Sequence, residues 1–167
     1  MNANTIPSGY TTLTPFLVVS PAADAIDWYV DVFGATVIDR LDGPVGEHGR
    51  PIVGQAELDF GTGRLQLSDP MPAFGLSAPS VEQPTHGSIV VYVDEVDAVV
   101  ARAEAKGATI REAPADFVSG DRYASIVDSF GQRWAVMTRV EDLEPEESIR
   151  RVHEWWATIA PSLAAGG

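Results

Sequence analysis

Residues 24–37 read DAIDWYVDVFGATV, and residues 97–110 repeat the pattern as DAVVARAEAKGATI. The Asp-Ala pairs and the Gly-Ala-Thr triplets share one offset, because 97 − 24 and 107 − 34 are both 73. Chance could supply one such match, but two at a common spacing favour an internal duplication. In the first copy, apolar residues recur at helical spacing up to Gly34, and β-forming residues follow. The chain is therefore predicted to contain one helix-and-strand unit twice.

The residues around the first copy predict a small sheet beside its helix. Ser20 and Pro21 are typical of a helix start, with the serine as N-cap and the proline at the first helical position. Residues 42–51 are rich in Gly and Pro and predict a loop. Alternating apolar residues and β-formers predict strands over 11–19, 35–41, 55–60 and 64–68.

The second copy has the same setting, which predicts the same unit again. Four of the twelve prolines fall within residues 69–85, so this segment is predicted to link the two units. A helix over 95–106 is expected among strands over 88–93, 109–113, 123–128 and 132–138. The tail predicts an amphipathic helix over 144–160, with an apolar stripe of Ile149, Val152, Trp156 and Ile159.

These elements predict an α+β fold in a single domain over residues 1–167. Two βαβββ modules form a curled mixed sheet with a concave cleft, and the C-terminal helix follows them. The first module is expected over 10–69, the linker over 70–86 and the second module over 87–139.

The alternation along each strand assigns its residues to two faces of the sheet. In the first strand, Leu13, Leu17 and Val19 are predicted to face the helix. The opposite faces carry aromatic, amide, carboxylate and hydroxyl groups, and a cleft with a few convergent polar groups is where ligands bind. We therefore predict one ligand-binding cleft formed by Thr14, Phe16, Gln55, Glu57, Gln66, Ser88 and Tyr92.

The composition excludes several classes of partner and site. The chain has no cysteine, which excludes disulfides, thiolate chemistry and Fe–S clusters. Its formal net charge of −13 disfavours binding to nucleic acid or to anionic membranes. No stretch approaches the roughly 20 apolar residues of a membrane span, and Met1–Thr5 lacks the features of a signal peptide. A cytoplasmic protein is expected.

Three segments carry a family resemblance: TPFLVVSPAADAIDWYVDVFGATV (14–37), YVDEVDAVVARAEAKGATI (92–110) and VDSFGQRW (127–134). They resemble the glyoxalase/bleomycin-resistance/dioxygenase (vicinal oxygen chelate) superfamily. Shorter segments resemble its PhnB-like branch, at residues 6–10, 119–122 and 138–147. The resemblance implies the paired βαβββ fold. It leaves the function open, because this superfamily hosts lyases, isomerases, dioxygenases, transferases and drug-sequestering proteins.

The resemblance also implies where a metal ion would be held. Metal-dependent members place one ligand on the first and last strand of each module, usually His, Glu or Gln. Those positions are here Thr14, Gln66, Ser88 and Ala135. A catalytic divalent site generally keeps three or more protein ligands, and a single Gln66 amide does not meet that requirement. We therefore predict no bound metal and no cofactor. Many members of the branch carry His where Gln55 stands, so a histidine role at the third strand is not expected either.

Several side chains have both a chemical and a structural interpretation. His86 either acts as an acid or base near neutral pH or is a loop histidine at the start of a strand. Glu57 is either a buried base or part of a solvated strand edge. Arg64 and Arg133 follow the two Gly turns, and they either clamp an anion or lie at the surface.

The aromatic residues also allow two interpretations. Phe16, Tyr92 and Trp134 could stack on a planar ligand. For Trp134 the strand alternation favours the core. Trp155 and Trp156 either cover the cleft or dock the tail helix onto the chain or onto a second subunit.

Three functions are compatible with these residues. The first is a non-catalytic protein that binds a small flat or hydrophobic molecule, as the resistance members of the superfamily do. The second is a metal-independent isomerase, lyase or cyclase that uses Glu57 or His86 for proton transfer. The third is a metal-dependent lyase or dioxygenase with displaced ligands, namely Gln55, Glu57, Gln66 and His86. The resemblance also implies a homodimer, and the apolar tail stripe favours one whose interface the tail helix partly covers.

Overall fold

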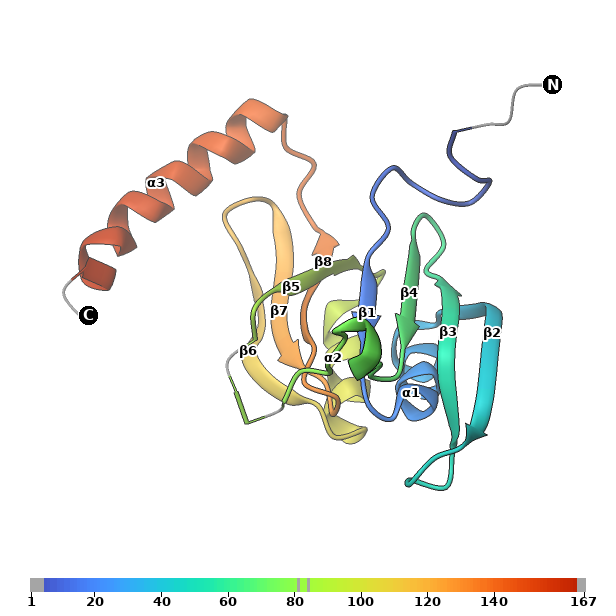
Figure 1. The fold of residues 1–167 in the computed structure, drawn as a ribbon. Coiled ribbons are helices and arrows are strands. Elements are labelled where there is room, and N and C mark those ends of the chain that lie inside the picture. Colours follow the sequence, from blue (N-terminus) through green and yellow to red (C-terminus); the bar gives the residue numbers. More distant parts are fainter. Residues whose placement is uncertain (1–4, 81, 84, 165–167) are drawn as a thin grey trace.

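Two four-stranded sheets lie side by side, and each has one helix on the face turned away from the viewer in Figure 1. The computed structural model describes residues 5–80, 82, 83 and 85–164. Most of the segment predicted to lack signal-peptide features, residues 1–4, lies outside the described residues. The predicted α+β fold with mixed sheets and a C-terminal helix is confirmed. Within the described residues, no strand pairing joins the two sheets into one.

In the first sheet, the first strand is shorter than the sequence predicted, and the second and third strands are longer. Its elements are β1 (Phe16–Val18), α1 (Ala22–Phe33), β2 (Thr36–Val45), β3 (Pro51–Asp59) and β4 (Arg64–Ser68). The order across the sheet is β1-β4-β3-β2, with β1 parallel to β4. The predicted loop over 42–51 is confirmed only over residues 46–50, because Asp42 pairs with Val53 and Val45 with Pro51.

The second sheet repeats this arrangement. Its elements are β5 (Ser88–Tyr92), α2 (Val96–Ala105), β6 (Thr109–Asp116), β7 (Asp121–Val127) and β8 (Arg133–Arg139), in the order β5-β8-β7-β6. Between the sheets the linker contains a short 3-10 helix, Pro72–Phe74, and after them comes α3 (Pro145–Ala164). No helix among the described residues is long and apolar enough to cross a membrane.

The start of α1 is capped from a distance and not by its own serine. Ser20 was predicted as the N-cap, but the helix begins at Ala22, and the preceding Pro21 provides no side-chain cap. Instead Asp69, just after β4, accepts a 3.0 Å hydrogen bond from the Ala22 N–H and a 2.7 Å bond from the Val53 N–H. This carboxylate therefore ties the helix to the sheet. The predicted C-terminal glycine is confirmed, since Gly34 has a φ of 73°.

The predicted helix-facing side of the first strand is confirmed at its end but not at its start. Leu17 packs against the core and Val19 is fully buried, as expected for the helix-facing side. Leu13 was assigned to the same face, but its side chain is 81% exposed. The reason is that β1 begins only at Phe16, so residues 11–15 do not follow the strand alternation.

A buried carboxylate joins the two modules. Asp128, just after β7, accepts a 3.0 Å hydrogen bond from the Tyr29 hydroxyl of α1 and a 2.9 Å bond from the Trp134 indole N–H of β8. Its other oxygen accepts from the backbone N–H groups of Phe130 and Gln132. Burial raises the pKa of Asp128, and these four donors oppose that rise. Burial and the charge of Asp128 also raise the pKa of Tyr29.

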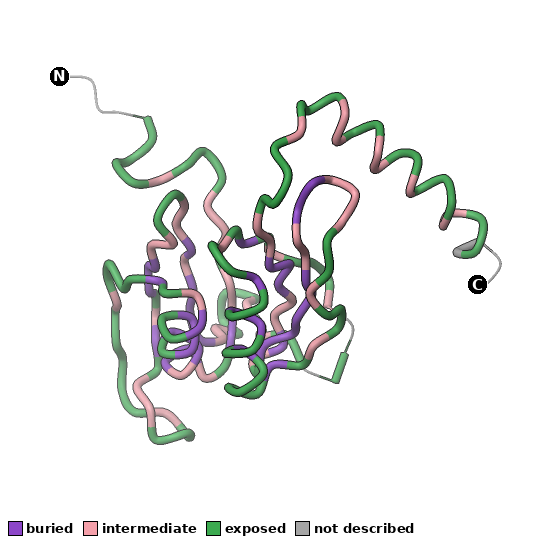
Figure 2. The backbone as a smooth tube through the Cα atoms, turned by 180° about the vertical axis from the view of Figure 1, so that it is seen from behind, coloured by how far each residue is buried: buried purple, intermediate pink, exposed green. Residues whose placement is uncertain are grey.

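Aromatic rings surround this carboxylate and close the core between the modules. The Trp134 ring centroid lies 4.8 Å from that of Phe33 and 5.2 Å from that of Tyr29. A second link comes from Trp28 of α1, whose indole N–H donates to the Lys106 carbonyl at 3.0 Å. Figure 2 shows the buried segments running through both helices and the strands beside them. The core is therefore shared by the two modules.

The tail helix α3 contrasts with this core, because none of its described side chains is buried. It stands away from the sheets in Figure 1. Its contacts with the body include the Trp155 ring, 4.8 Å from that of Phe117, and a hydrogen bond from Ser148 Oγ to the Ser119 carbonyl. Ile149 and Trp156 are 56% and 53% exposed. Trp155 thus docks the helix, while part of the predicted apolar stripe has no cover within the described residues.

Replacing Tyr29 by Phe tests the junction. We expect Tyr29→Phe to lower the free energy of unfolding by about 1–2 kcal/mol, because Asp128 loses a donor that water cannot replace. Chemical denaturation measures this change. Tyr123→Phe is the matched control, since the Tyr123 hydroxyl donates to Glu112 at an exposed site, and a change within about 0.5 kcal/mol is expected. Equal losses in the two variants would contradict a special role for the junction.

Candidate functional site

Equivalent rows of residues cross the open face of each sheet, the face without the helix. In the first sheet the register aligns one residue from each strand: Asp39, Glu57, Gln66 and Phe16. In the second sheet it aligns Glu112, Ser125, Ala135 and Val90. Because β4 and β8 are the last strands of the two modules, their residues in these rows occupy equivalent places.

In the first row, Glu57 lies in an ion pair that the sequence did not reveal. The Arg64 guanidinium donates to one carboxylate oxygen of Glu57, and the Tyr10 hydroxyl donates to the other. The Glu57 and Arg64 side chains are only 12% and 17% exposed. Gln66 Nε2 in turn donates to the Tyr10 hydroxyl at 3.3 Å. Arg64 was predicted to lie either at the surface or on an anion, and its partner is instead this buried carboxylate.

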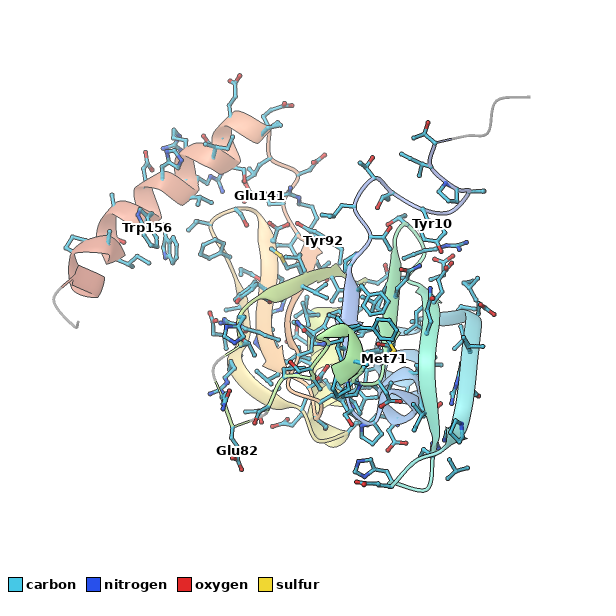
Figure 3. All side chains as sticks on the ribbon, viewed as in Figure 1. Tyr10, Met71, Glu82, Tyr92, Glu141 and Trp156 are labelled. Atoms are coloured by element: carbon cyan, nitrogen blue, oxygen red, sulfur yellow. The ribbon has the colours of Figure 1, made fainter. Side chains whose placement is uncertain are left out.

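Tyr10 reaches this cluster from the segment that precedes β1. Figure 3 shows it beside the ends of β3 and β4. The Arg64 guanidinium carbon lies 4.9 Å from the centroid of the Tyr10 ring, a distance typical of a cation–π contact. Gly9 has a φ of 85°, and a Cβ at this position would collide with the guanidinium. The backbone at this point therefore requires a glycine.

The second sheet has a related but more open cluster. Arg133 Nη2 lies 3.0 Å from Glu112 Oε1, and the Tyr123 hydroxyl donates to the same oxygen at 3.2 Å. Here the arginine and glutamate side chains are 38% and 53% exposed. Both modules therefore place an arginine, a glutamate and a tyrosine on the open face, but only the first module shields them from water.

The larger of two cavities between the modules, about 600 Å³ in volume, lies where the linker passes over the facing edges of β1 and β5. Its walls include Phe16 and the backbone around it. The polar side chains that line it are hydroxyls, amides and one imidazole: Ser77, Ser80, Thr85, Ser88, Gln83, Gln132 and His86. None of its lining residues, all in the described part of the chain, carries a carboxylate, ammonium or guanidinium group. This lining matches a neutral ligand with hydrogen-bonding groups.

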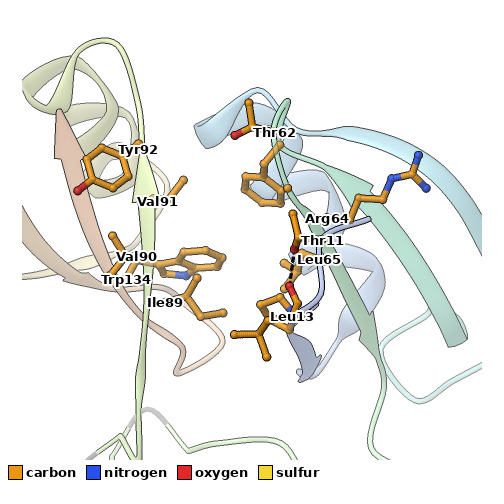
Figure 4. Close-up of a pocket in the computed structure, with 13 residues that line it drawn as sticks. Thr11, Leu13, Thr62, Arg64, Leu65, Ile89, Val90, Val91, Tyr92 and Trp134 are labelled. Atoms are coloured by element: carbon orange, nitrogen blue, oxygen red, sulfur yellow. Dashed lines mark hydrogen bonds between the residues drawn. The ribbon is translucent and has the colours of Figure 1, made fainter. Parts of the chain in front are cut away.

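A smaller cavity of about 250 Å³ opens between β5 on one side and the segment before β1 and the start of β4 on the other, and it reaches the core. Figure 4 shows Tyr92, Val90 and Ile89 on one side and Leu13 and Leu65 on the other. In the same view the Arg64 guanidinium points away from this cavity. Phe60 and Trp134 also line it, so the cavity is mostly apolar.

The predicted site residues fall into three neighbouring places. Phe16 and Ser88 line the larger cavity together with His86, and Tyr92 lines the smaller one. Glu57 and Gln66 belong to the polar cluster on the first sheet. Phe16 connects the cavity to the cluster, because it pairs with Gln66 in the register.

Gln55 and Thr14 have weaker links to these places. Gln55 is exposed on β3 and pairs with Leu41. Thr14 lies before β1, and its hydroxyl is 3.5 Å from the Thr11 carbonyl oxygen. That all seven residues serve one ligand remains a prediction.

The residues at the four implied metal positions do not fit a transition-metal site. The Ala135 side chain has no donor atom, Thr14 and Ser88 offer only neutral hydroxyls, and Gln66 offers a single amide oxygen. Within the described residues, no three His, Cys, Asp or Glu side chains come together as possible ligands. The alternative set of displaced ligands depends on Glu57, whose two oxygens are engaged by Arg64 and Tyr10.

The sequence model of the Glyoxalase/Bleomycin resistance protein/Dioxygenase superfamily matches residues 10–136. The chain belongs to this superfamily. A relative in Mycobacterium bovis, the uncharacterized protein Mb0911c, is 36% identical over 138 residues, which cover 81% of this chain and 88% of that protein.

Solved structures have the same fold. TioX from Micromonospora sp. ML1 is 26% identical with a TM-score of 0.57, covering 77% of this chain and 98% of that one. A PhnB protein from Bacillus cereus is 16% identical with a TM-score of 0.57, covering 77% and 99%. The fosfomycin resistance protein FosX from Listeria monocytogenes, solved with Mn(II) and sulfate, is 14% identical with a TM-score of 0.57, covering 89% and 100%. At such identities the last two support the fold alone.

Sequence reasoning missed Tyr10 and the pairing of Arg64 with Glu57. Tyr10 lies in the segment Ile6–Tyr10, which resembles the PhnB-like branch, but no spacing rule places that segment against β3 and β4. The alternation did place Arg64, Gln66 and Glu57 on one face of the sheet, and this was the available signal. The prediction that Trp134 belongs to the core is confirmed, since it is 1% exposed.

Proposed function

We propose that the chain binds a small, neutral, partly aromatic organic molecule in the larger cavity, without a metal ion, and acts by sequestering it in the cytoplasm. The observation that carries this proposal is the cavity of about 600 Å³ with its uncharged polar lining and Phe16 in its wall. Its volume lies within the range of about 300–1,000 Å³ that is usual for small-molecule sites. Membership of a superfamily that includes bleomycin resistance proteins supports a sequestering role.

A metal-independent enzyme is the second candidate, and one observation favours it. His86 lines the same cavity as Ser88, so an imidazole could exchange a proton with a bound molecule. Glu57 is the weaker candidate base, because Arg64 and Tyr10 already occupy its carboxylate.

A screen of neutral aromatic compounds by isothermal titration calorimetry tests the proposal. For any compound that binds, we expect Phe16→Ala to weaken binding roughly tenfold, because apolar contact area is lost. Phe74→Ala is the matched control, since Phe74 is 78% exposed and lines neither cavity. An unchanged affinity in Phe16→Ala would contradict the proposed site. Mass spectrometry of the bound compound separates the two candidates: an intact compound supports sequestration, and a product lost in His86→Ala supports the enzyme.

We also propose that two copies form a twofold homodimer in which α3 covers part of the interface. Ile149 and Trp156 are more than half exposed, and β1 and β5 each have only one neighbouring strand among the described residues. Exposed edges and apolar patches of this kind are usually covered in a stable assembly.

Light scattering at micromolar concentration is expected to give the mass of two chains. A stable pair of this kind would bury at least about 1,200 Å². Trp156→Glu is expected to shift the protein toward the monomer, because it places a charge in the interface. The control Thr158→Glu adds the same charge at another exposed position of α3 and should leave the mass unchanged. A monomer mass for the unmodified chain would overturn this proposal.

A further inference from the structure

The polar cluster on the first sheet is built around a phenol that the chain supplies itself. The Tyr10 hydroxyl donates to Glu57 and accepts from Gln66 Nε2, so both its hydrogen-bonding roles are used. The Arg64 guanidinium lies over the Tyr10 ring at 4.9 Å. Three groups therefore contact the phenol. The carboxylate accepts a hydrogen bond from its hydroxyl, the amide donates one to its oxygen, and the guanidinium lies over the face of its ring.

Apart from Tyr10 itself, the segment over residues 5–13 is weakly attached to the sheets. Residues 5–9 and 11–13 are exposed, and the backbone N–H of Tyr10 donates locally, to the Pro7 carbonyl. Among the described residues of this segment, Tyr10 is the one whose side chain hydrogen-bonds to the sheet. Release of Tyr10 would therefore break few other interactions.

The bound segment also leaves one donor of the cluster unpaired. Arg64 Nε is buried and has no hydrogen-bond partner within the described residues. A Cβ built on Gly9 would lie 2.8 Å from this nitrogen, so the Gly9 backbone covers it closely. A buried donor without an acceptor is unfavourable, and a ligand with an acceptor oxygen near its hydroxyl would remove that cost.

We propose that this cluster is a subsite for a ligand's aromatic hydroxyl group, and that Tyr10 occupies it as an internal ligand until such a molecule displaces it. The subsite adjoins the larger cavity, because Gln66 pairs with Phe16, which lines that cavity. The inference rests on the proposed binding function and narrows its ligand class to hydroxylated aromatic molecules. The remainder of such a ligand would extend along Phe16 into the uncharged cavity.

Removing the Tyr10 side chain leaves a cavity in the cluster, so that the subsite can be tested with a defined probe. In the full-length Tyr10→Ala variant, 4-methylphenol replaces the lost side chain, and we expect it to bind at least about tenfold more tightly than to the unmodified protein. Toluene lacks the hydroxyl, and 4-methylcyclohexanol lacks the aromatic face. Each should bind the variant at least about tenfold more weakly than 4-methylphenol does. Calorimetry or chemical-shift titration measures all three.

Two further variants control the test. Tyr10→Phe keeps the ring in place, so it should not gain affinity for 4-methylphenol. Adding Glu57→Gln to Tyr10→Ala should weaken 4-methylphenol binding but leave toluene binding unchanged. Circular dichroism checks that each variant is folded.

Equal binding of toluene and 4-methylphenol to Tyr10→Ala would overturn the inference, because the cluster would then offer only space. A failure of 4-methylphenol to bind the folded variant better than the unmodified protein would overturn it as well. The outcome is separable from the proposed function. Ligands that depend on Phe16 but show no preference for a hydroxyl would leave the cavity proposal standing and the subsite refuted. If Tyr10→Ala binds hydroxylated compounds selectively but no ligand depends on Phe16, the subsite stands and the cavity proposal is refuted.

Discussion

The four hydrogen bonds to the Asp128 carboxylate are the constraint on which the arrangement of the two modules depends. The carboxylate belongs to the second module, but one of its donors is Tyr29, from the first. Both groups are almost fully buried, so a shift of one module against the other would leave the Tyr29 hydroxyl without its partner and would remove one of the four donors to the carboxylate. Together with the aromatic core around it, this bond holds the edges of β1 and β5 opposite each other. The two cavities between the modules take their shape from that placement.

The open faces of the two sheets carry similar sets of polar side chains. Each module has an arginine, a glutamate and a tyrosine there, but only Glu57 and Arg64 are shielded from water. A carboxylate engaged by a guanidinium and a phenol is suited to hold a hydroxyl and poorly suited to act as a free base or a metal ligand. This supports the proposal that the face recognises a ligand. His86, in the neighbouring cavity, is the group that remains available for proton transfer.

Much of the fold follows from local patterns in the sequence. The repeated helix-and-strand unit, the glycine at the end of α1 and the burial of Leu58, Leu65 and Leu67 all follow from spacing and alternation. What the patterns missed depends on contacts between distant residues. Asp69 caps α1 from 47 positions away in the chain, and no local motif signals this.

The site, like the fold, could be predicted from local patterns but not where it depends on contacts between distant residues. Alternation placed Glu57 and Gln66 on one face, and the resemblance identified Gln66 and Ala135 as equivalent positions. The partner of Glu57 could not be read from the sequence, because Tyr10 lies outside the regular elements and reaches the sheet only through the tertiary fold. Likewise, most of the polar lining of the larger cavity comes from the linker, whose sequence has no strand or helix pattern.

The metal content of the purified protein tests the central claim, that this member of the superfamily binds its ligand without a metal ion. The protein should be prepared without chelator, incubated with Mn²⁺ or Zn²⁺, dialysed and measured by plasma mass spectrometry. The account predicts fewer than about 0.1 metal ions per chain, because one amide does not make a divalent site. About one ion per chain, lost on replacing Gln66 with Leu, would contradict it.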